Sequence, residues 1–269
     1  MPDIERYYGP GREDARLRTG SGRLELERMR GLMDRFLPPA PAVVFDVGGG
    51  TGIHAFWLAG KGYKVHLLDV VPVHIEEARK ASATQRRAPL AEMVVGDARS
   101  LPWPDAGADA VLLLGPLYHL TALEDRRSAL KEARRVLEPG GTVLAAGISR
   151  FASALDGIRE GYLKDPAFAA IVEGDLADGR HSNPTGRVEY FMDTFFHHPE
   201  ELRSEVASAG FEAVNVLGVE GPGWLAHDFD AWWDDPALRE RLLGLARRLE
   251  AEPALAGLSA HLLAVARKP

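Results

Sequence analysis

The fold of this chain is decided by one segment, Val43-Val44-Phe45-Asp46-Val47-Gly48-Gly49-Gly50-Thr51-Gly52. Its first half is an almost continuous run of β-branched and aromatic residues, which is typical of a parallel strand covered on both faces. Its second half is a glycine-rich turn, where backbone N–H groups can approach a ligand that a Cβ atom would exclude. The helix expected next presents a positive N-terminal end. The segment therefore predicts a binding site for a small, partly anionic cofactor.

The spacing of the glycines narrows the kind of cofactor. A dinucleotide fingerprint requires G-x-G-x-x-G, whereas this chain has Gly48-x-Gly50-x-Gly52, with Ile53 in the place of the last glycine. Asp46 lies inside the strand, two positions before the first glycine, where a carboxylate would oppose a pyrophosphate. The carboxylate suits a ligand with a cationic end, such as the ammonium and sulfonium of S-adenosylmethionine.

Two further carboxylates end apolar runs. Asp69 ends the run at residues 65–69, about 20 residues after the glycine turn, where such folds place the acceptor for ribose hydroxyls. Asp97 ends the run at residues 93–97, where a carboxylate can accept a hydrogen bond from the adenine amino group. The alternatives are a helix cap at Asp69 and a turn residue at Asp97.

These motifs give the chain a resemblance to a known family. It resembles the class I S-adenosylmethionine-dependent methyltransferases over roughly residues 40–147, and again near 199–217 and 259–267. The resemblance is carried by Asp46-Val47-Gly48-Gly49-Gly50-Thr51-Gly52, by Asp69, by Gly96-Asp97-Ala98, and by residues 109–119 and 130–141. A lone glycine motif is a weak signal, whereas five motifs in family order are specific.

The resemblance implies a cofactor and the residues that hold it. The cofactor is S-adenosyl-L-methionine, and no metal is expected. Its expected contacts are Asp46, Gly48, Gly49, Gly50, Asp69, Val70, Asp97, Ala98, Leu114, Gly115 and Tyr8. Tyr8 is included because the segment before the first strand often folds over the cofactor in relatives, where a Tyr or Arg can meet the methionine carboxylate. The alternative for this arm, which also carries Arg12, Arg16 and Arg18, is a solvated segment.

The resemblance and the alternation of strands and helices predict an α/β fold. We expect a doubly wound, seven-stranded, mostly parallel sheet, the Rossmann-like methyltransferase fold, with helical lid insertions after strands five and six. The expected strands are 42–47, 64–68, 92–96, 108–114, 142–147, 212–218 and 260–267. The expected units are an N-terminal arm and helix over the cofactor (1–39), a cofactor-binding core (40–147), a lid or substrate insertion (148–198), and the end of the core (199–269) with a second insertion at 219–258.

Candidate catalytic residues follow the fourth strand. Tyr118 and His119 lie where the methyl group points in this fold, and a His there can accept a proton from an attacking oxygen or nitrogen. The alternative for His119 is a packed or capping histidine. His181 and His197 are second-line candidates for the base. The insertions are rich in aromatic residues, which form either the lid's own core or the wall of an acceptor pocket. We expect Trp224 to be one such wall residue.

Composition limits the remaining choices. The chain has 269 residues, a net charge of −7 and no cysteine, which argues against a general nucleic-acid binder and excludes a disulfide framework. With no apolar signal core and no apolar run of membrane length, the cytoplasm is the default location and no membrane association is expected. A homodimer is possible.

The sequence thus predicts methyl transfer to a small, apolar or aromatic metabolite, with an oxygen acceptor favoured over nitrogen. The alternatives are an RNA or protein methyltransferase, and a protein that binds S-adenosylmethionine without transferring its methyl group.

Overall fold

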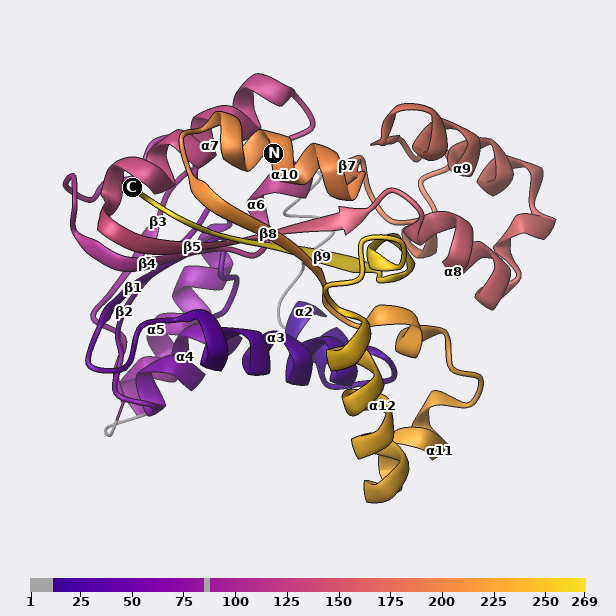
Figure 1. The fold of residues 1–269 in the computed structure, drawn as a ribbon, viewed down its shortest axis with the longest axis horizontal. Coiled ribbons are helices and arrows are strands. Elements are labelled where there is room, and N and C mark those ends of the chain that lie inside the picture. The colour runs from indigo at the N-terminus through magenta and orange to yellow at the C-terminus, as the bar shows by residue number, and fades with distance from the viewer. Residues whose placement is uncertain (1–11, 85–87) are drawn as a thin grey trace.

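The protein is described by a computed structural model that covers residues 12–84 and 88–269. Within these residues the strands form one sheet in the order β3-β2-β1-β4-β5-β7-β6, with β9 beside β5 and β8 beside β9 (Figure 1). The strands are β1 (Val43–Val47), β2 (Lys64–Asp69), β3 (Glu92–Val95), β4 (Ala108–Leu113), β5 (Leu137–Ser149), β6 (Arg180–His181), β7 (Thr194–His197), β8 (Glu212–Gly218) and β9 (His261–Arg267).

The central part of the sheet is parallel. Strands β1 to β5 pair in parallel with their neighbours, and β9 runs antiparallel between β5 and β8. The carboxyl ends of β1 to β5 therefore share one edge of the sheet, and the first residue of β9 reaches the same edge. All seven strands expected from the sequence are present, and the predicted Rossmann-like α/β class is confirmed, but the sheet has nine strands rather than the expected seven.

Helices cover both faces of this sheet (Figure 1). The α-helices are α2 (Arg12–Leu17), α3 (Gly22–Phe36), α4 (Ile53–Gly60), α5 (Pro72–Thr84), α6 (Pro116–His119), α7 (Leu123–Val136), α8 (Ala152–Glu160), α9 (Pro166–Asp178), α10 (Pro199–Ser208), α11 (Phe229–Asp234) and α12 (Pro236–Leu249). The 3-10 helices are η1 (Tyr162–Lys164), η2 (Val188–Tyr190), η3 (Gly221–Leu225) and η4 (Ala256–Leu258). None of the helices in the described ranges is long and apolar enough to cross a membrane.

The two faces have separate cores because side chains alternate along each strand. In β1, Val44 packs in a cluster with residues of α3, α4 and α5. Its neighbours Phe45 and Val47 pack in the opposite cluster with residues of α7 and α10. The apolar run that opens the deciding segment is thus buried on both sides, as its composition predicts.

The first insertion differs from the expected helical lid. Residues 148–198 contain α8 and α9, but they also contain β6 and the four-residue strand β7. β7 pairs in parallel with Ile148 and Ser149 at the end of β5, and Ile148 also pairs with β9. Because a strand has only two edges, β7 must lie on the β4 side of β5, beyond the end of β4. The insertion therefore extends the sheet at the edge where ligands bind.

The aromatic residues of the insertions form cores of their own. Phe168 and Tyr190 are buried together with Tyr162 packed against them. Trp224 is 5% exposed, and its Nε1 donates a hydrogen bond to the Leu258 carbonyl at 2.8 Å. The expectation that Trp224 walls the acceptor pocket is wrong: the indole is buried in the packing of the second insertion, and its only polar atom is bonded to backbone.

Candidate active site

One cleft follows the carboxyl edge of the sheet. It is lined by residues at the ends of β1, β2, β3, β4 and β5, by the start of β9, and by α2, α3 and α6. It holds about 1360 Å³ of space, the solvent at its mouth included.

The glycine loop after β1 is shaped by backbone geometry. Gly48, Gly50 and Gly52 have φ angles of +72°, +59° and +94°, which side chains with a Cβ atom rarely allow. A Cβ on Gly48 would lie 2.7 Å from Pro116, the first residue of α6, whereas a Cβ on Gly50 would enter open space. The glycines thus let the loop pack against the start of α6 and leave room in the cleft.

The N–H groups of this loop have protein partners. Gly48 and Gly49 donate hydrogen bonds to the Leu68 carbonyl at 2.7 and 3.3 Å, and Gly50 donates to Asp69 at 2.8 Å. The sequence indicated these N–H groups as ligand donors. In the structure they fix the loop to the end of β2 instead, so the loop contributes space and shape to the cleft.

Asp46 is a carboxylic acid in an unusual position, because it is buried in the wall of the cleft. Its side chain is buried, with 1% of its surface exposed, and neither carboxylate oxygen has a hydrogen-bond partner in the described part of the chain. Burial, together with the negative charge of Asp69, raises the pKa of Asp46 to about 7. A buried carboxylate without a partner is costly, so this position fits the ammonium group of a bound cofactor.

Asp69 ends β2 and organises the neighbouring backbone. One of its oxygens accepts the hydrogen bond from Gly50, and the other accepts from the Val71 N–H at 2.9 Å and lies 3.1 Å from Nδ1 of His74. Each carboxylate oxygen has two lone pairs, so the group retains capacity for ribose hydroxyls. The helix-cap and ribose interpretations are therefore compatible. Asp69 is also buried and already has three protein partners, so it contributes to the structure as well.

Asp97 follows β3 and lines the same cleft. Arg99 binds both of its oxygens, at 2.6 Å through Nη2 and at 3.0 Å through Nε, and also reaches Asp125 at 3.0 Å. These hydrogen bonds lower the pKa of Asp97, which keeps it ionised. An adenine amino group would therefore share this carboxylate with Arg99. Val70, Ala98, Leu114 and Gly115, the other predicted contacts, also line the cleft.

The segment before β1 closes one side of the cleft. Leu17 of α2 and Met29 of α3 line it, and Asp14 accepts a hydrogen bond from the Thr51 hydroxyl at 2.9 Å. The arm is thus fastened to the glycine loop. Arg16, considered as a partner of the methionine carboxylate, is paired with Glu25. Tyr8 lies outside the described residues.

Tyr118 and His119 lie in α6, directly after β4, and both line the cleft. Their rings are 4.6 Å apart, and the His119 ring is 6.5 Å from that of Phe191. A Cβ on Gly115 would lie 3.1 Å from the Gly48 carbonyl, so the start of α6 packs directly against the glycine loop. The two predicted catalytic residues therefore share a cavity with the predicted cofactor residues.

His181 is a wrong prediction for the base. It does not line the cleft and is 3% exposed. Its Nδ1 lies 2.9 Å from Asp175, its Nε2 lies 2.8 Å from the Tyr190 carbonyl, and its ring stacks on Phe196. With both nitrogens bonded inside the first insertion, His181 has a structural role.

His197 is also wrong as a candidate base. It is fully buried at the end of β7, away from the cleft, and lies 3.5 Å from Glu205, which Arg126 also binds. Burial lowers the pKa of His197, so it stays neutral. It packs against Gly147 of β5, where a Cβ would lie 2.8 Å from its Nδ1.

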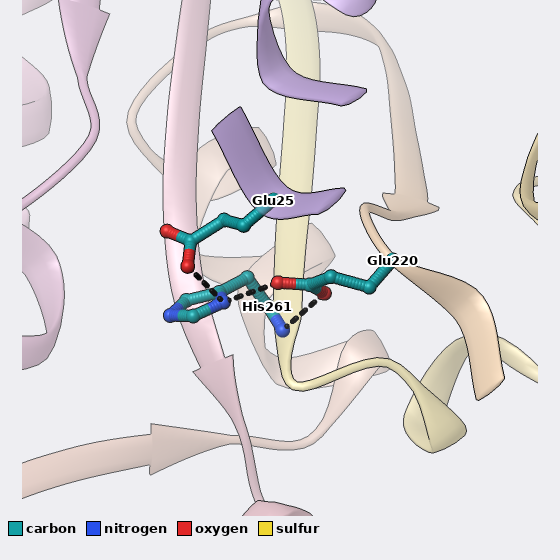
Figure 2. A group of neighbouring side chains, drawn as sticks. All are labelled: Glu25, Glu220 and His261. Carbon is teal, nitrogen blue, oxygen red and sulfur yellow. Dashed lines mark hydrogen bonds and ion pairs between the residues drawn. The ribbon is translucent and has the colours of Figure 1, made fainter. Parts of the chain in front are cut away.

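The sequence did not single out a further histidine in the cleft. His261 begins β9 and contacts Glu220 and Glu25 (Figure 2). Both His261 and Glu25 line the cleft. The available signal was a lone charged position at the start of an apolar strand, Ala260-His261-Leu262-Leu263. Its two partners lie in distant segments and could not be inferred from that pattern.

Comparison with known proteins agrees with this geometry. A family model described as a methyltransferase domain matches residues 45–145. The ubiquinone/menaquinone biosynthesis C-methyltransferase UbiE of Azotobacter vinelandii is 30% identical over 184 residues, which cover 66% of this chain and 69% of the relative. The protein of the same name from Acidiphilium cryptum is 30% identical over 190 residues, covering 69% and 72%.

Solved structures share the fold. A methyltransferase dependent on S-adenosylmethionine from Methanosarcina mazei has 20% identity and a TM-score of 0.59, covering 88% of this chain and 96% of that one. The [4+2]-cyclase SpnF has 21% identity and a TM-score of 0.54, covering 91% and 81%.

The parallel sheet, the glycine loop and the acids at the carboxyl ends of β1, β2 and β3 define a nucleotide-cofactor enzyme of the Rossmann-like kind. The chain belongs to the class I S-adenosylmethionine-dependent methyltransferases, and S-adenosylmethionine is its cofactor. The orphaned carboxylate of Asp46 and the open space at Gly50 fit this cofactor.

Proposed function

We propose that the enzyme transfers the methyl group to a small, apolar or aromatic metabolite. The supporting observation is the single cleft, in which the cofactor residues at the ends of β1 to β3 continue into a second part. We assign to this second part Tyr118, His119, Met29, Leu17 and His261, which all line the cleft. The lining of the cleft as a whole is mainly apolar with a few polar groups, which is typical of a site for a discrete small molecule.

The cofactor, when bound, supplies a methyl group activated by its positive sulfur. Asp46, Asp69 and Asp97 would hold the cofactor, which would donate its methyl group to the acceptor atom and keep the electron pair of the former sulfur–methyl bond on sulfur. The chain's own task is to align the reactants and exclude water, which can contribute several kcal/mol to lowering the barrier. We assign to His119 the acceptance of the acceptor's proton, and to Tyr118 the positioning of the acceptor beside it.

We propose oxygen as the acceptor atom, ahead of nitrogen, because a hydroxyl has a proton to lose and a histidine lies in the second part of the cleft. Carbon is the second candidate. It is favoured by the similarity to relatives that are named C-methyltransferases. When an aromatic hydroxyl compound ionises, its oxygen and the ring carbons ortho and para to it become nucleophilic. One site can therefore serve methylation at oxygen or at carbon.

The segments around the cleft have proposed roles as well. The arm and helix of residues 1–39 would cover the cofactor, which the lining residues of α2 and α3 support. The insertions would restrict access to the acceptor side, which the position of β7 beyond the end of β4 supports. We place the enzyme in the cytoplasm and leave a homodimer as a possible assembly.

The test is a methyl-transfer assay with S-adenosylmethionine that carries a ¹³C-labelled methyl group. The acceptor panel contains phenols, quinols, aliphatic alcohols and amines, with bulk tRNA and a protein extract as macromolecular acceptors. Products are separated by mass spectrometry and read by NMR, because oxygen-, nitrogen- and carbon-bound methyl groups differ in ¹³C shift. A labelled small phenol or quinol supports the proposal. Labelling confined to tRNA or protein contradicts it, and the reacting atom decides between oxygen and carbon.

A further inference from the structure

Glu25, Glu220 and His261 form a cluster of charged residues (Figure 2), and two of them, Glu25 and His261, line the cleft. His261 Nδ1 lies 2.6 Å from one oxygen of Glu220 and 3.6 Å from Glu25. The second oxygen of Glu220 accepts hydrogen bonds from the Ser259 hydroxyl at 2.6 Å and from the His261 N–H at 3.0 Å. Both partners of the imidazole are thus carboxylates, and Glu220 is held in place by its own hydrogen bonds.

The second ring nitrogen is available to a ligand. Figure 2 shows Nε2 of His261 on the side of the ring away from Glu220. None of the hydrogen bonds found for the described residues involves this atom, and the His261 side chain lines the cleft with 18% of its surface exposed. Because Nδ1 is bound to a carboxylate, it carries a proton, and this fixes the orientation of the ring.

The charge of the cluster favours an imidazolium. Four ionisable groups face one another here, from α2, α3, the loop after β8 and β9: Arg16, Glu25, Glu220 and His261. Burial opposes the charged form of His261, but the two carboxylates outweigh both burial and Arg16 and raise its pKa to about 9. The group is therefore cationic at neutral pH and loses its charge only as the pH rises through about 9.

The cluster has no need of a metal ion. The three residues Glu25, Glu220 and His261 could offer ligand atoms within 4.8 Å of one another. Arg16 already binds both oxygens of Glu25, and the imidazolium faces Glu220. The two negative charges are thus balanced by two positive ones, and the nitrogen that a metal would require is the protonated Nδ1.

The strand order places His261 on the acceptor side. Along the carboxyl edge the cleft residues run from Asp97 after β3, through Asp69 at the end of β2 and Asp46 in β1, to Gly115 after β4, Ala146 in β5 and His261 in β9. The first three hold the cofactor in the assignment above. His261 pairs with Ile148, beyond the end of β4, and so lies at the opposite end of this series from Asp97.

We propose that His261 binds an ionised oxygen of the methyl acceptor, carried by a phenol, an enol or a carboxylate. This inference rests on the proposed function and specifies its substrate class. The acceptor of this enzyme is an organic acid of this kind, apolar elsewhere, whose oxygen accepts a hydrogen bond from Nε2–H of His261. An adjacent positive charge stabilises the ionised form of such an oxygen, so His261 is a specificity-determining and positioning residue for the transfer.

The test uses three probes of similar size with the enzyme saturated with S-adenosylhomocysteine, in the presence of EDTA. 4-Nitrophenol offers a phenolate, benzoate offers a carboxylate, and 4-nitroanisole is the neutral counterpart of 4-nitrophenol. Binding is measured by calorimetry, and the absorbance of 4-nitrophenol reports its ionisation in the complex. We expect one or both anions to bind at least tenfold more tightly than 4-nitroanisole. The apparent pKa of bound 4-nitrophenol should fall, and anion binding should weaken as the pH rises through about 9.

The variant His261→Gln keeps a hydrogen-bond donor but loses the charge. Because charge-assisted hydrogen bonds are roughly twice as strong as neutral ones, anion binding should weaken about tenfold. Binding of 4-nitroanisole and S-adenosylhomocysteine should stay unchanged. Glu220→Gln removes a carboxylate that raises the pKa of His261. In this variant His261 should lose its proton, and the enzyme its anion binding, at lower pH. His227→Gln, an exposed histidine outside the cleft, is the matched control and should behave as wild type.

Each other outcome has a defined meaning. Equal binding of anions by wild type and His261→Gln, or binding of none of the three probes, overturns the inference. A variant that loses S-adenosylhomocysteine instead of the anions would also overturn it, because His261 would then hold the cofactor. Methyl transfer to amines with no dependence on His261 would leave the small-molecule function standing and reject this subsite. Anion binding at His261 without any methyl transfer to small molecules would support this subsite and reject the small-molecule function.

Discussion

At the scale of single residues, the cleft contains two ionisable groups whose pKa values are both raised, Asp46 and His261. Asp46 is buried beside another acid and has no partner, so its pKa rises to about 7. His261 is surrounded by acids, so its pKa rises to about 9. Ionised Asp46 would be stabilised by a cationic group of a ligand, whereas protonated His261 can bind an anionic group of a ligand. Such perturbed groups gather at functional sites.

Replacing Asp46 should separate cofactor binding from stability. In the protein without cofactor, the raised pKa of Asp46 means that stability is lost as pH rises from about 4 to about 7, because a buried proton must then be given up. Asp46→Asn removes this penalty. We expect a higher Tm for the variant than for wild type at alkaline pH, and no such gain at acidic pH. Scanning calorimetry across pH measures both.

The same replacement should weaken the cofactor. A charge-assisted hydrogen bond contributes about 1.5–3 kcal/mol, so the affinity of Asp46→Asn for S-adenosylmethionine should fall roughly tenfold to a hundredfold. In wild type the affinity should fall as pH drops below about 7, since protonation of Asp46 removes the partner of the ammonium. Isothermal titration tests this. An affinity that is independent of both pH and the substitution would show that Asp46 does not bind the cofactor.

Replacing His119 should lower kcat without changing the affinity for the cofactor. If it accepts the proton of an oxygen acceptor, His119→Ala should lower kcat by about a hundredfold or more, because general bases contribute roughly 10²–10⁴ in rate. The cofactor affinity should change little. Single-turnover kinetics on the acceptor identified by the labelling assay is the measurement. An unchanged kcat would leave positioning as the main contribution of α6.

Asp69 connects two elements, because its oxygens accept hydrogen bonds from the glycine loop and from the turn that leads into α5. Asp69→Ala should therefore lower cofactor affinity tenfold to a hundredfold and also lower Tm, since Gly50 and Val71 lose their acceptor. Tm and Kd are measured on the same preparation. Loss of stability with wild-type affinity would restrict Asp69 to its capping role.

At the scale of elements, local pattern was sufficient for the core and insufficient for the insertions. The strands β1 and β4 were predictable because their apolar runs are continuous and are bounded by turn residues. β7 was not, because Thr194–His197 has only four residues and forms through pairing with the distant end of β5. The aromatic residues near it indicate burial equally well for a lid core and for a pocket wall.

The same limit explains the candidate site. Asp46, Asp69 and Asp97 could be predicted because each ends or lies in a recognisable strand. His181 and His197 were poor candidates because sequence reveals neither the Asp175 and Tyr190 partners of the first nor the burial of the second. His261 was missed because its strongest partner, Glu220, is 41 residues away along the chain.

Trp224 tests the assignment of the second insertion as a packed unit. The indole is buried and donates to the Leu258 carbonyl. Trp224→Ala should lower the free energy of unfolding by about 3–5 kcal/mol, as large-to-small core substitutions do, with little change in acceptor KM. Thermal unfolding beside steady-state kinetics separates the two effects. A raised KM at unchanged Tm would return Trp224 to the acceptor pocket.

At the scale of the whole molecule, the sheet arranges the reaction along one edge. In the proposed assignment, the cofactor residues lie at the ends of β3, β2 and β1, and the acceptor residues lie at the ends of β4 and β5 and the start of β9, all of them in the lining of one cleft. This order follows from parallel strands with crossover helices, which bring every carboxyl end to the same side. The antiparallel β9 adds its first residue, His261, to the same edge.

The most direct measurement of the central claim is calorimetric titration of the purified protein with S-adenosylmethionine, S-adenosylhomocysteine and NAD, in wild type and in Asp46→Asn. We predict that the first two ligands bind wild type with one site per chain, that Asp46→Asn weakens both, and that NAD does not bind. Binding of NAD without binding of S-adenosylmethionine would contradict the account, because the glycine loop and Asp46 would then serve a dinucleotide.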